Sequence, residues 1–194
     1  MKISKTTLSV ALSAITLVSA FSGCSGKKKA SIEEWGAYNT LKVIRQTDKN
    51  DEYEKLPAKL SAEMTKNEYE GAQLILTSDK RVSYELIKSD LVSSDGKKFP
   101  AENISVYHQK YIEISKNNSG NKAYESGSFV PDMLLPMEKA VEYGENFIEA
   151  NSNQGVTVEF CSTGVEAGEY TGEFTLKTGD EERKVPVSVT VWDI

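Results

Sequence analysis

Hydrophobic and polar residues alternate with a period of two along most of the chain after Thr40, which is typical of strands with one buried face. The segment KVPVSVTVW, residues 184–192, shows the pattern most clearly, because every second residue is valine. The segments GVTVEFC at 155–161 and YTGEFTLKT at 170–178 follow the same rule. Each of the three therefore predicts a strand whose apolar side chains enter a common core.

The segments at 170–178 and 184–192 are joined by TGDEER, in which Gly179 and Asp180 are turn residues. We therefore expect a C-terminal β-hairpin. Near its start, Gly168 stands two residues before Tyr170, which resembles the tyrosine corner of immunoglobulin-like sandwiches, where the phenol bonds back to upstream backbone. We expect Tyr170 to stabilise the fold in this way rather than to contact a ligand.

Further strands are predicted upstream, and the one helical competitor is the short segment MEKAVEYG at 137–144. About eight short strands separated by polar turn segments predict an all-β chain, folded as an antiparallel two-sheet β-sandwich of the immunoglobulin-like or jelly-roll-like kind. The upstream strand candidates are TLKVIRQ at 40–46, AKLSAEM at 58–64, GAQLILTS at 71–78, VSYELIK at 82–88 and ISVYHQKYIEIS at 104–115.

The first residues of the chain have the features of an export signal. Lys2 and Lys5 precede the uncharged segment TTLSVALSAITLVSAF, which is short for a bilayer span of about 20 residues. It ends in FSGC, which resembles the lipobox of bacterial lipoproteins, with Phe21 in place of the usual leucine. A short uncleaved anchor and ordinary secretion are the alternatives to lipidation.

These features divide the chain into three predicted parts. They are a lipoprotein signal peptide over residues 1–23, a lipid-anchored tether over 24–34 that begins with lipidated Cys24, and a β-sandwich domain over 35–194. A lipid-modified cysteine carries more than one acyl chain, and this is enough for stable membrane attachment. We therefore expect a chain anchored through lipid to the extracytoplasmic side of the bacterial cell envelope.

Composition and charge narrow the possible functions. With 39% hydrophobic and 27% charged residues the chain is ordinary for a globular protein, and its net charge of −6 argues against nucleic acid. The one histidine, His108, cannot build a catalytic triad or a zinc cluster, and we expect a hydrogen bond to satisfy it. The sequence has no phosphate-binding loop or dinucleotide fingerprint, so we predict no cofactor.

Two acidic patterns remain as candidates for chemistry. The segment DKNDEYE at 48–54 loosely resembles a calcium loop, but Tyr53 and Lys59 stand where an EF-hand needs glycine and glutamate. Glu68 and Glu70 could be spaced like a glycosidase pair, but the start of a surface strand is not the closed cleft that pKa tuning requires. We predict no metal site and no catalytic residue in this chain, with both glutamates bonded to nearby backbone or facing solvent.

Five segments occur in an order and spacing that point to a known family. They are NEYEGAQLIL at 67–76, PDMLLP at 131–136, NQGVTVEF at 153–160, AGEYTGEFTL at 167–176 and VPVSVTVWDI at 185–194. Together they resemble the N-terminal β-sandwich of glycoside hydrolase family 123 and of related bacterial surface lipoproteins of unknown function. The chain departs from the resemblance at Thr157, where relatives tend to have tryptophan, and at Cys161 and Ser162, where they tend to have Val-Pro.

The resemblance implies that the sandwich is an accessory domain preceding a (β/α)8 barrel. In the family, an Asp-Glu pair on that barrel acts on N-acetylgalactosaminides with help from the substrate's acetamido group. A barrel takes about 250 residues and is therefore not expected within these residues. We expect a non-catalytic module of a glycan-degrading surface protein, with Trp192 and Asp193 at the edge facing the barrel. Ordinary strand-end packing is the alternative role for these two residues.

Other functions stay open on the sequence alone. A stand-alone carbohydrate-binding module needs exposed aromatic rings, for which Trp35, Tyr107 and Tyr111 are the candidates, with core packing as the alternative. Tyr107 and Tyr111 share one strand face if no bulge intervenes. A structural or adhesive surface domain needs a protein partner, which nothing in the sequence marks. A free-standing enzyme would have to use Glu68 and Glu70.

Overall fold

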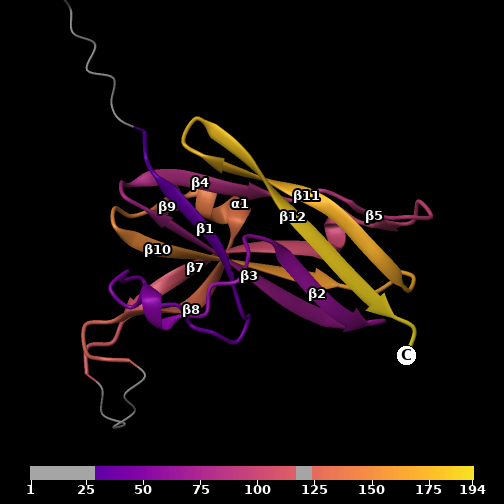
Figure 1. Ribbon diagram of the computed structural model, residues 1–194, viewed down its shortest axis with the longest axis horizontal. Helices are drawn as coiled ribbons and strands as arrows, with labels where there is room; N and C mark the ends of the chain where they lie inside the picture. The colour runs from indigo at the N-terminus through magenta and orange to yellow at the C-terminus, as the bar shows by residue number, and fades with distance from the viewer. Residues whose placement is uncertain (1–28, 117–123) are drawn as a thin grey trace, which may run out of the picture.

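The computed structural model describes residues 29–116 and 124–194, which form a sandwich of two β-sheets (Figure 1). The prediction of an all-β sandwich is confirmed, since strands dominate the described residues and their one α-helix, α1, spans only Met137–Glu142. This helix lies within residues 137–144, the one segment for which a helix was the alternative to a strand. The predicted signal peptide and Cys24 lie outside the described residues.

One sheet has five strands, all paired antiparallel. Its first strand starts before the predicted domain boundary at Trp35. Its last strand, FVPDMLLP, lacks the alternation on which the strand predictions rest, and the pattern did not predict it. In spatial order the strands are β1 (Ile32–Ala37), β3 (Tyr69–Ser78), β10 (Ser152–Cys161), β7 (Ile104–Glu113) and β8 (Phe129–Pro136).

The second sheet has seven strands, of which β2 runs parallel to β12 while the other pairs are antiparallel. Two 3₁₀ turns, at Asn50–Glu52 and Ala101–Asn103, lie in the connections. The main path of the sheet is β2 (Leu60–Thr65), β12 (Glu181–Trp192), β11 (Gly168–Thr178), β4 (Val82–Ile87) and β9 (Phe147–Ile148), and the short strands β5 (Leu91–Ser93) and β6 (Lys98–Phe99) extend it from β11.

The main hydrophobic core lies between the two sheets. The four predicted valines of β12 are 1–3% exposed and share one buried cluster with Leu74 and Leu76 of β3. The ring of Phe99 meets Phe160 and Tyr170 edge-on, with centroids 6.1 and 5.7 Å apart. Such aromatic pairs contribute about 0.5–1.5 kcal/mol each beyond the burial of their area. The period-two pattern therefore identified the core face of these strands correctly.

A second, smaller core covers the outer face of the five-stranded sheet. The predicted strand at 40–46 is wrong, because these residues belong to an irregular segment, residues 38–59, that packs on this face. Val43 is fully buried there beside Ile75 of β3. The segment is thus a loop that crosses the sheet, and its apolar residues are buried against the sheet face without pairing as a strand.

This covering segment, residues 38–59, is tied to β1 by backbone contacts. Gly36 and Leu56 exchange two backbone hydrogen bonds of 2.9 Å each. A Cβ atom at Gly36 would lie 2.7 Å from the carbonyl oxygen of Pro57, so only glycine allows this close approach. The side-chain amide of Gln73 on β3 also donates to the carbonyl oxygen of Leu41, at 3.0 Å.

The predicted C-terminal hairpin is confirmed. Strands β11 and β12 pair continuously from Gly168 opposite Val191 to Thr178 opposite Glu181, and Gly179 in the turn takes a left-handed φ of +57°. The hydroxyl of Tyr170 donates to the carbonyl oxygen of Glu166 at 2.8 Å, which is the hydrogen bond expected of a tyrosine corner. Tyr170 therefore has the structural role predicted from its spacing to Gly168.

Replacing Tyr170 by phenylalanine tests the tyrosine corner. Tyr170→Phe keeps the buried ring and removes the one hydrogen bond to Glu166, so we expect the free energy of unfolding to fall by about 1 kcal/mol. Urea denaturation at neutral pH measures this change. Tyr143→Phe is the matched control, because Tyr143 is exposed and its hydroxyl makes no hydrogen bond among the described residues. Equal stabilities for the two variants would contradict the assigned role.

Candidate functional site

Trp35, a predicted sugar-stacking residue, lies in the second core. Its side chain is only 2% exposed, and the ring of Tyr53 from the covering segment stacks on it with centroids 6.1 Å apart. A buried indole offers no open face to a pyranose ring. Trp35 therefore packs in a core, which was the alternative to sugar stacking for this residue.

Tyr107 and Tyr111 do not form a shared exposed strip. The pairing of β7 with β8 shifts register between Lys110 and Tyr111, so the uninterrupted ladder on which the shared face depends is absent. The hydroxyl of Tyr111 accepts a hydrogen bond of 3.0 Å from the backbone N–H of Gly155. Tyr111 is therefore committed to holding β7 against β10, and Tyr107 is left as a single half-buried ring.

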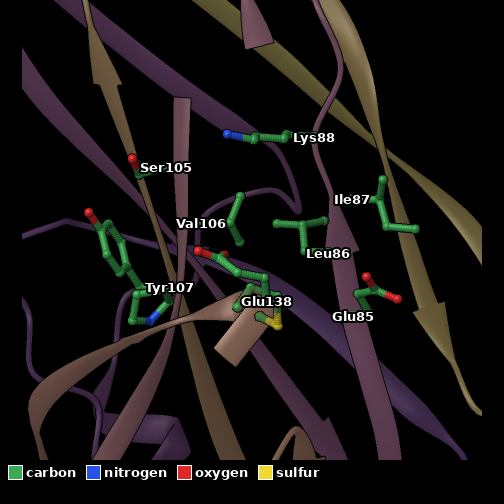
Figure 2. Close-up of a pocket in the computed structure, with 10 residues that line it drawn as sticks. Glu85, Leu86, Ile87, Lys88, Ser105, Val106, Tyr107 and Glu138 are labelled. Carbon is green, nitrogen blue, oxygen red and sulfur yellow. The ribbon is translucent and has the colours of Figure 1, made fainter. Parts of the chain in front are cut away.

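A small hollow opens on one side of the sandwich, between β4, β7 and the start of α1 (Figure 2). It measures about 270 Å³, and Leu86 and Val106 are among its apolar lining residues. Figure 2 shows the side chain of Tyr107 pointing away from it. Over the hollow, the ammonium of Lys88 donates to the carbonyl oxygen of Ile104 and so links the two sheets. This hydrogen bond gives Lys88, which directly follows β4, a role in joining the sheets.

Glu68 and Glu70 both accept hydrogen bonds from nearby backbone, Glu68 in the β2–β3 turn and Glu70 at the start of β3. Glu68 accepts hydrogen bonds from the backbone N–H of Thr65 at 2.6 Å and from its hydroxyl at 3.0 Å, and these bonds lower the pKa of Glu68. Glu70 accepts from the N–H of Gly71 at 3.0 Å. A general acid needs a raised pKa, so the shift of Glu68 is in the wrong direction for that role. The prediction that both acids bond nearby backbone is confirmed.

The acidic segment 48–54 also has a structural role. Asn50 is buried, and its amide donates to the side-chain oxygen of Asn153 on β10 at 3.1 Å. A group of three His, Cys, Asp or Glu side chains placed to hold a metal ion does not occur in residues 29–116 and 124–194. The segment therefore anchors part of the covering loop on the sheet.

His108 is a buried histidine satisfied by one strong contact. Its Nδ1 lies 2.6 Å from the hydroxyl of Tyr84 on the facing sheet, and the two rings stack with centroids 5.9 Å apart. Burial lowers the pKa of His108 to about 4, so the ring is neutral at pH 7. This pair joins the two sheets, in agreement with the sequence expectation of a hydrogen-bonded histidine.

Trp192 and Asp193 lie where β12 ends. Trp192 is 50% exposed, and Asp193 pairs with Lys66 of the β2–β3 turn, which lowers the pKa of Asp193. Ile194 beyond them is almost fully exposed. This end of the sandwich thus presents apolar surface beside a charge pair.

The two ends of the described chain lie at opposite ends of the sandwich (Figure 1). Lys29 pairs with Glu181 at the start of β12, at 3.0 Å, whereas Trp192 closes the same strand. At about 3.3 Å per residue, this strand separates the two positions by roughly 36 Å. No helix in the described part of the chain is long and apolar enough to cross a membrane.

Comparison with solved structures shows where this fold occurs elsewhere. A family 123 glycoside hydrolase from Clostridium perfringens superposes with a TM-score of 0.63 over 84% of this chain at 12% identity. The chain spans only 28% of that hydrolase chain. At this identity the likeness shows the fold alone, a distant relationship to one part of the hydrolase. No family model and no curated protein matches the sequence.

Two bacterial pilins are more loosely similar. The CooA pilin subunit from enterotoxigenic Escherichia coli superposes with a TM-score of 0.35 at 13% identity, over 79% of this chain and 98% of the pilin. The MyfA subunit of Yersinia enterocolitica fimbriae, solved in complex with galactose, gives 0.35 at 11% identity, over 84% of this chain and 99% of MyfA. At these TM-scores the pilins support no inference about function.

The buried histidine makes stability depend on pH in a defined direction. His108 stays neutral in the folded chain down to about pH 4, whereas it protonates near its ordinary pKa of about 6.5 when unfolded. The unfolded state therefore gains protons first, and stability is lost as the pH falls below about 6.5. We expect this group to remove about 2 kcal/mol of the free energy of unfolding between pH 7 and pH 5.

The His108→Gln variant isolates this contribution, because glutamine does not titrate and still offers an acceptor to Tyr84. Urea denaturation at pH 7 and pH 5 should show a smaller loss of stability in the variant than in the parent chain. A loss of the same size in both proteins would mean that His108 does not cause the acid sensitivity.

Proposed function

We propose that this chain is the non-catalytic N-terminal β-sandwich module of a lipid-anchored, glycan-degrading surface protein whose (β/α)8 barrel follows beyond residue 194. The observation that carries the proposal is the superposition of 84% of the chain on a 28% portion of a family 123 glycoside hydrolase. A sandwich that matches a minor part of a hydrolase chain suits an accessory domain. The five sequence segments that resemble the same family support the proposal independently.

Glu68 in the β2–β3 turn and Glu70 at the start of β3 support a non-catalytic role. Both glutamates that could imitate a glycosidase pair are committed to backbone hydrogen bonds, and Glu68 has a lowered pKa. Inverting and retaining glycosidases both need one carboxyl that holds its proton as a general acid. Catalysis would then rest on acids of the barrel.

The separation of the chain ends supports a spacer role between membrane and catalytic domain. A lipid anchor at Cys24 would connect to the described chain through Lys29, at one end of the sandwich, and a barrel would follow from Trp192 at the other end. Strand β12 alone sets a distance of roughly 36 Å between these ends. The module thereby holds the barrel away from the membrane and toward extracellular glycans.

The gene sequence beyond codon 194 and an activity assay test the proposal together. We expect the reading frame to continue for about 250 further residues. The longer protein should release the chromophore from a chromogenic N-acetylgalactosaminide, whereas this chain alone should not. Glu68→Gln and Glu70→Gln in the longer protein should leave the rate unchanged. A stop codon directly after Ile194, or hydrolysis by this chain alone, would overturn the proposal.

The exposed strand end predicts where the two domains meet. In the longer protein, Trp192→Ala should lower the melting temperature of the sandwich by several degrees, because the indole would lose a buried contact with the barrel. The same substitution in this chain alone is the control and should have little effect, since half of the side chain already faces solvent. Equal effects in both proteins would place the barrel elsewhere. Calorimetry measures both transitions.

A further inference from the structure

A second hollow, lined almost entirely by polar side chains, lies near the start of β4, where β7, β9 and the covering segment come together. Its volume is about 310 Å³, which is at the small end of ligand pockets and enough for one sugar ring. The segments that contribute to it are far apart in the sequence. The charged residues that line it are Arg45, Arg81, Lys110, Glu145 and Glu149.

The two guanidinium groups are held in place by aromatic rings. Arg81 lies 3.6 Å from the centroid of the Phe147 ring and donates through Nε to Glu149 at 3.1 Å. Arg45 lies over Phe129 at 5.7 Å and reaches the same carboxylate at 4.0 Å. An isolated surface ion pair would contribute little, but each arginine also makes a cation–π contact, which is close for Arg81 and longer for Arg45. These contacts favour the observed positions of the two side chains in the absence of a ligand.

The two guanidinium groups keep N–H donors that no hydrogen bond with the described residues uses. The carboxylate of Glu149 accepts the hydrogen bond from Nε of Arg81. The terminal nitrogens of Arg81 have no hydrogen-bond partner among the described residues. Arg45 makes no side-chain hydrogen bond with that part of the chain, only the longer ion pair. Two planar groups with free N–H donors beside one hollow match the two oxygens of a carboxylate.

His108 supplies a further donor to the same hollow, which it helps to line. The hydroxyl of Tyr84 lies 2.6 Å from Nδ1 of His108, and in the tautomer that the proposal uses this hydroxyl is the donor and Nδ1 the acceptor. The proton of the neutral imidazole then lies on Nε2. This nitrogen has no protein partner in residues 29–116 and 124–194, so its N–H is available to an acceptor.

The charge in the hollow favours a single anion. Lys110 pairs with Glu145 at 2.6 Å, and the two arginines share the one carboxylate of Glu149. Three cations face two carboxylates, which leaves one positive charge in excess, although the whole chain carries a net charge of −6. A local surplus in an acidic protein attracts a monoanion and disfavours a cation.

We propose that this hollow binds the carboxylate of an acidic sugar, a hexuronate, through the free N–H groups of Arg45 and Arg81, with His108 Nε2–H donating to a ring or hydroxyl oxygen. Phe147, whose ring carries the guanidinium of Arg81, also lines the hollow. The site is made only of residues of this chain, so it does not depend on a further domain.

A neighbouring hollow extends the site and limits its charge preference. It measures about 540 Å³ and shares Arg45 and Glu149 with the first one, so a glycan can continue from one to the other. Asp48 lines this second space and makes it unfavourable for a second anion. The pair of hollows therefore suits one uronic acid followed by a neutral sugar.

Titration of the isotopically labelled, purified protein with sodium D-glucuronate, followed by NMR, tests the site. D-Glucose is the matched ligand, because it has the same ring without the carboxylate. Glucuronate should shift the amide signals of Gly144, Glu145 and Phe147 with saturation in the millimolar range, and glucose should not. Equal shifts with glucose would overturn the carboxylate recognition. Equal affinity for acetate or inorganic phosphate would overturn the role of the sugar.

Arginine-to-lysine variants locate the binding. Arg81→Lys keeps the charge but removes the planar fork, so glucuronate affinity should fall about tenfold. Arg183→Lys is the matched control, since Arg183 also pairs with carboxylates, Glu34 and Glu181, and lies outside both hollows. Its affinity should equal that of the parent chain. Unchanged affinity in Arg81→Lys, or an equal loss in both variants, would overturn the site.

Discussion

Strand β3 is buried on both of its faces, and the rest of the structure follows from how this is achieved. Leu74 and Leu76 enter the core between the sheets, while Ile75, pointing the other way, is covered by the irregular segment 38–59. One strand thus connects two cores. Covering the outer face requires a long loop to lie flat on a sheet, with its polar backbone satisfied, and this constrains residues on several strands.

The covered face shows how that constraint is met. Buried amide side chains form hydrogen bonds where a loop cannot form a ladder: Gln109 donates to Gln73 at 2.6 Å, and Asn153 donates to Asn50 at 2.6 Å. Gly155 leaves room for Gln109, whose side-chain oxygen would lie 1.8 Å from a Cβ atom there. These contacts occupy the outer face of the five-stranded sheet, where an exposed aromatic strip would have to lie. Trp35 is buried beneath the same loop.

The arrangement of the ends connects this fold to the proposed role at the cell surface. Entry of the chain beside the β11–β12 turn and exit at the far end of β12 allow a sandwich to separate two attached parts. The hollow proposed to bind an acidic sugar lies near the start of β4, and its lining residues come from both sheets and from the covering segment. A surface module with its own weak affinity for an acidic glycan would keep an attached catalytic domain close to its substrate.

Sequence periodicity determined the strands whose environment is two-sided, with one face in a core and one in solvent. The valines of β12, the hairpin turn at Gly179 and the bond of Tyr170 to Glu166 are local patterns, and all three could be predicted. Segment 40–46 has strand-like composition but is a loop, because the partner that buries Val43 is a sheet face distant in sequence. The hollow around Arg45 and Arg81 leaves no sequence signal, since its residues come from separate segments whose convergence depends on tertiary packing.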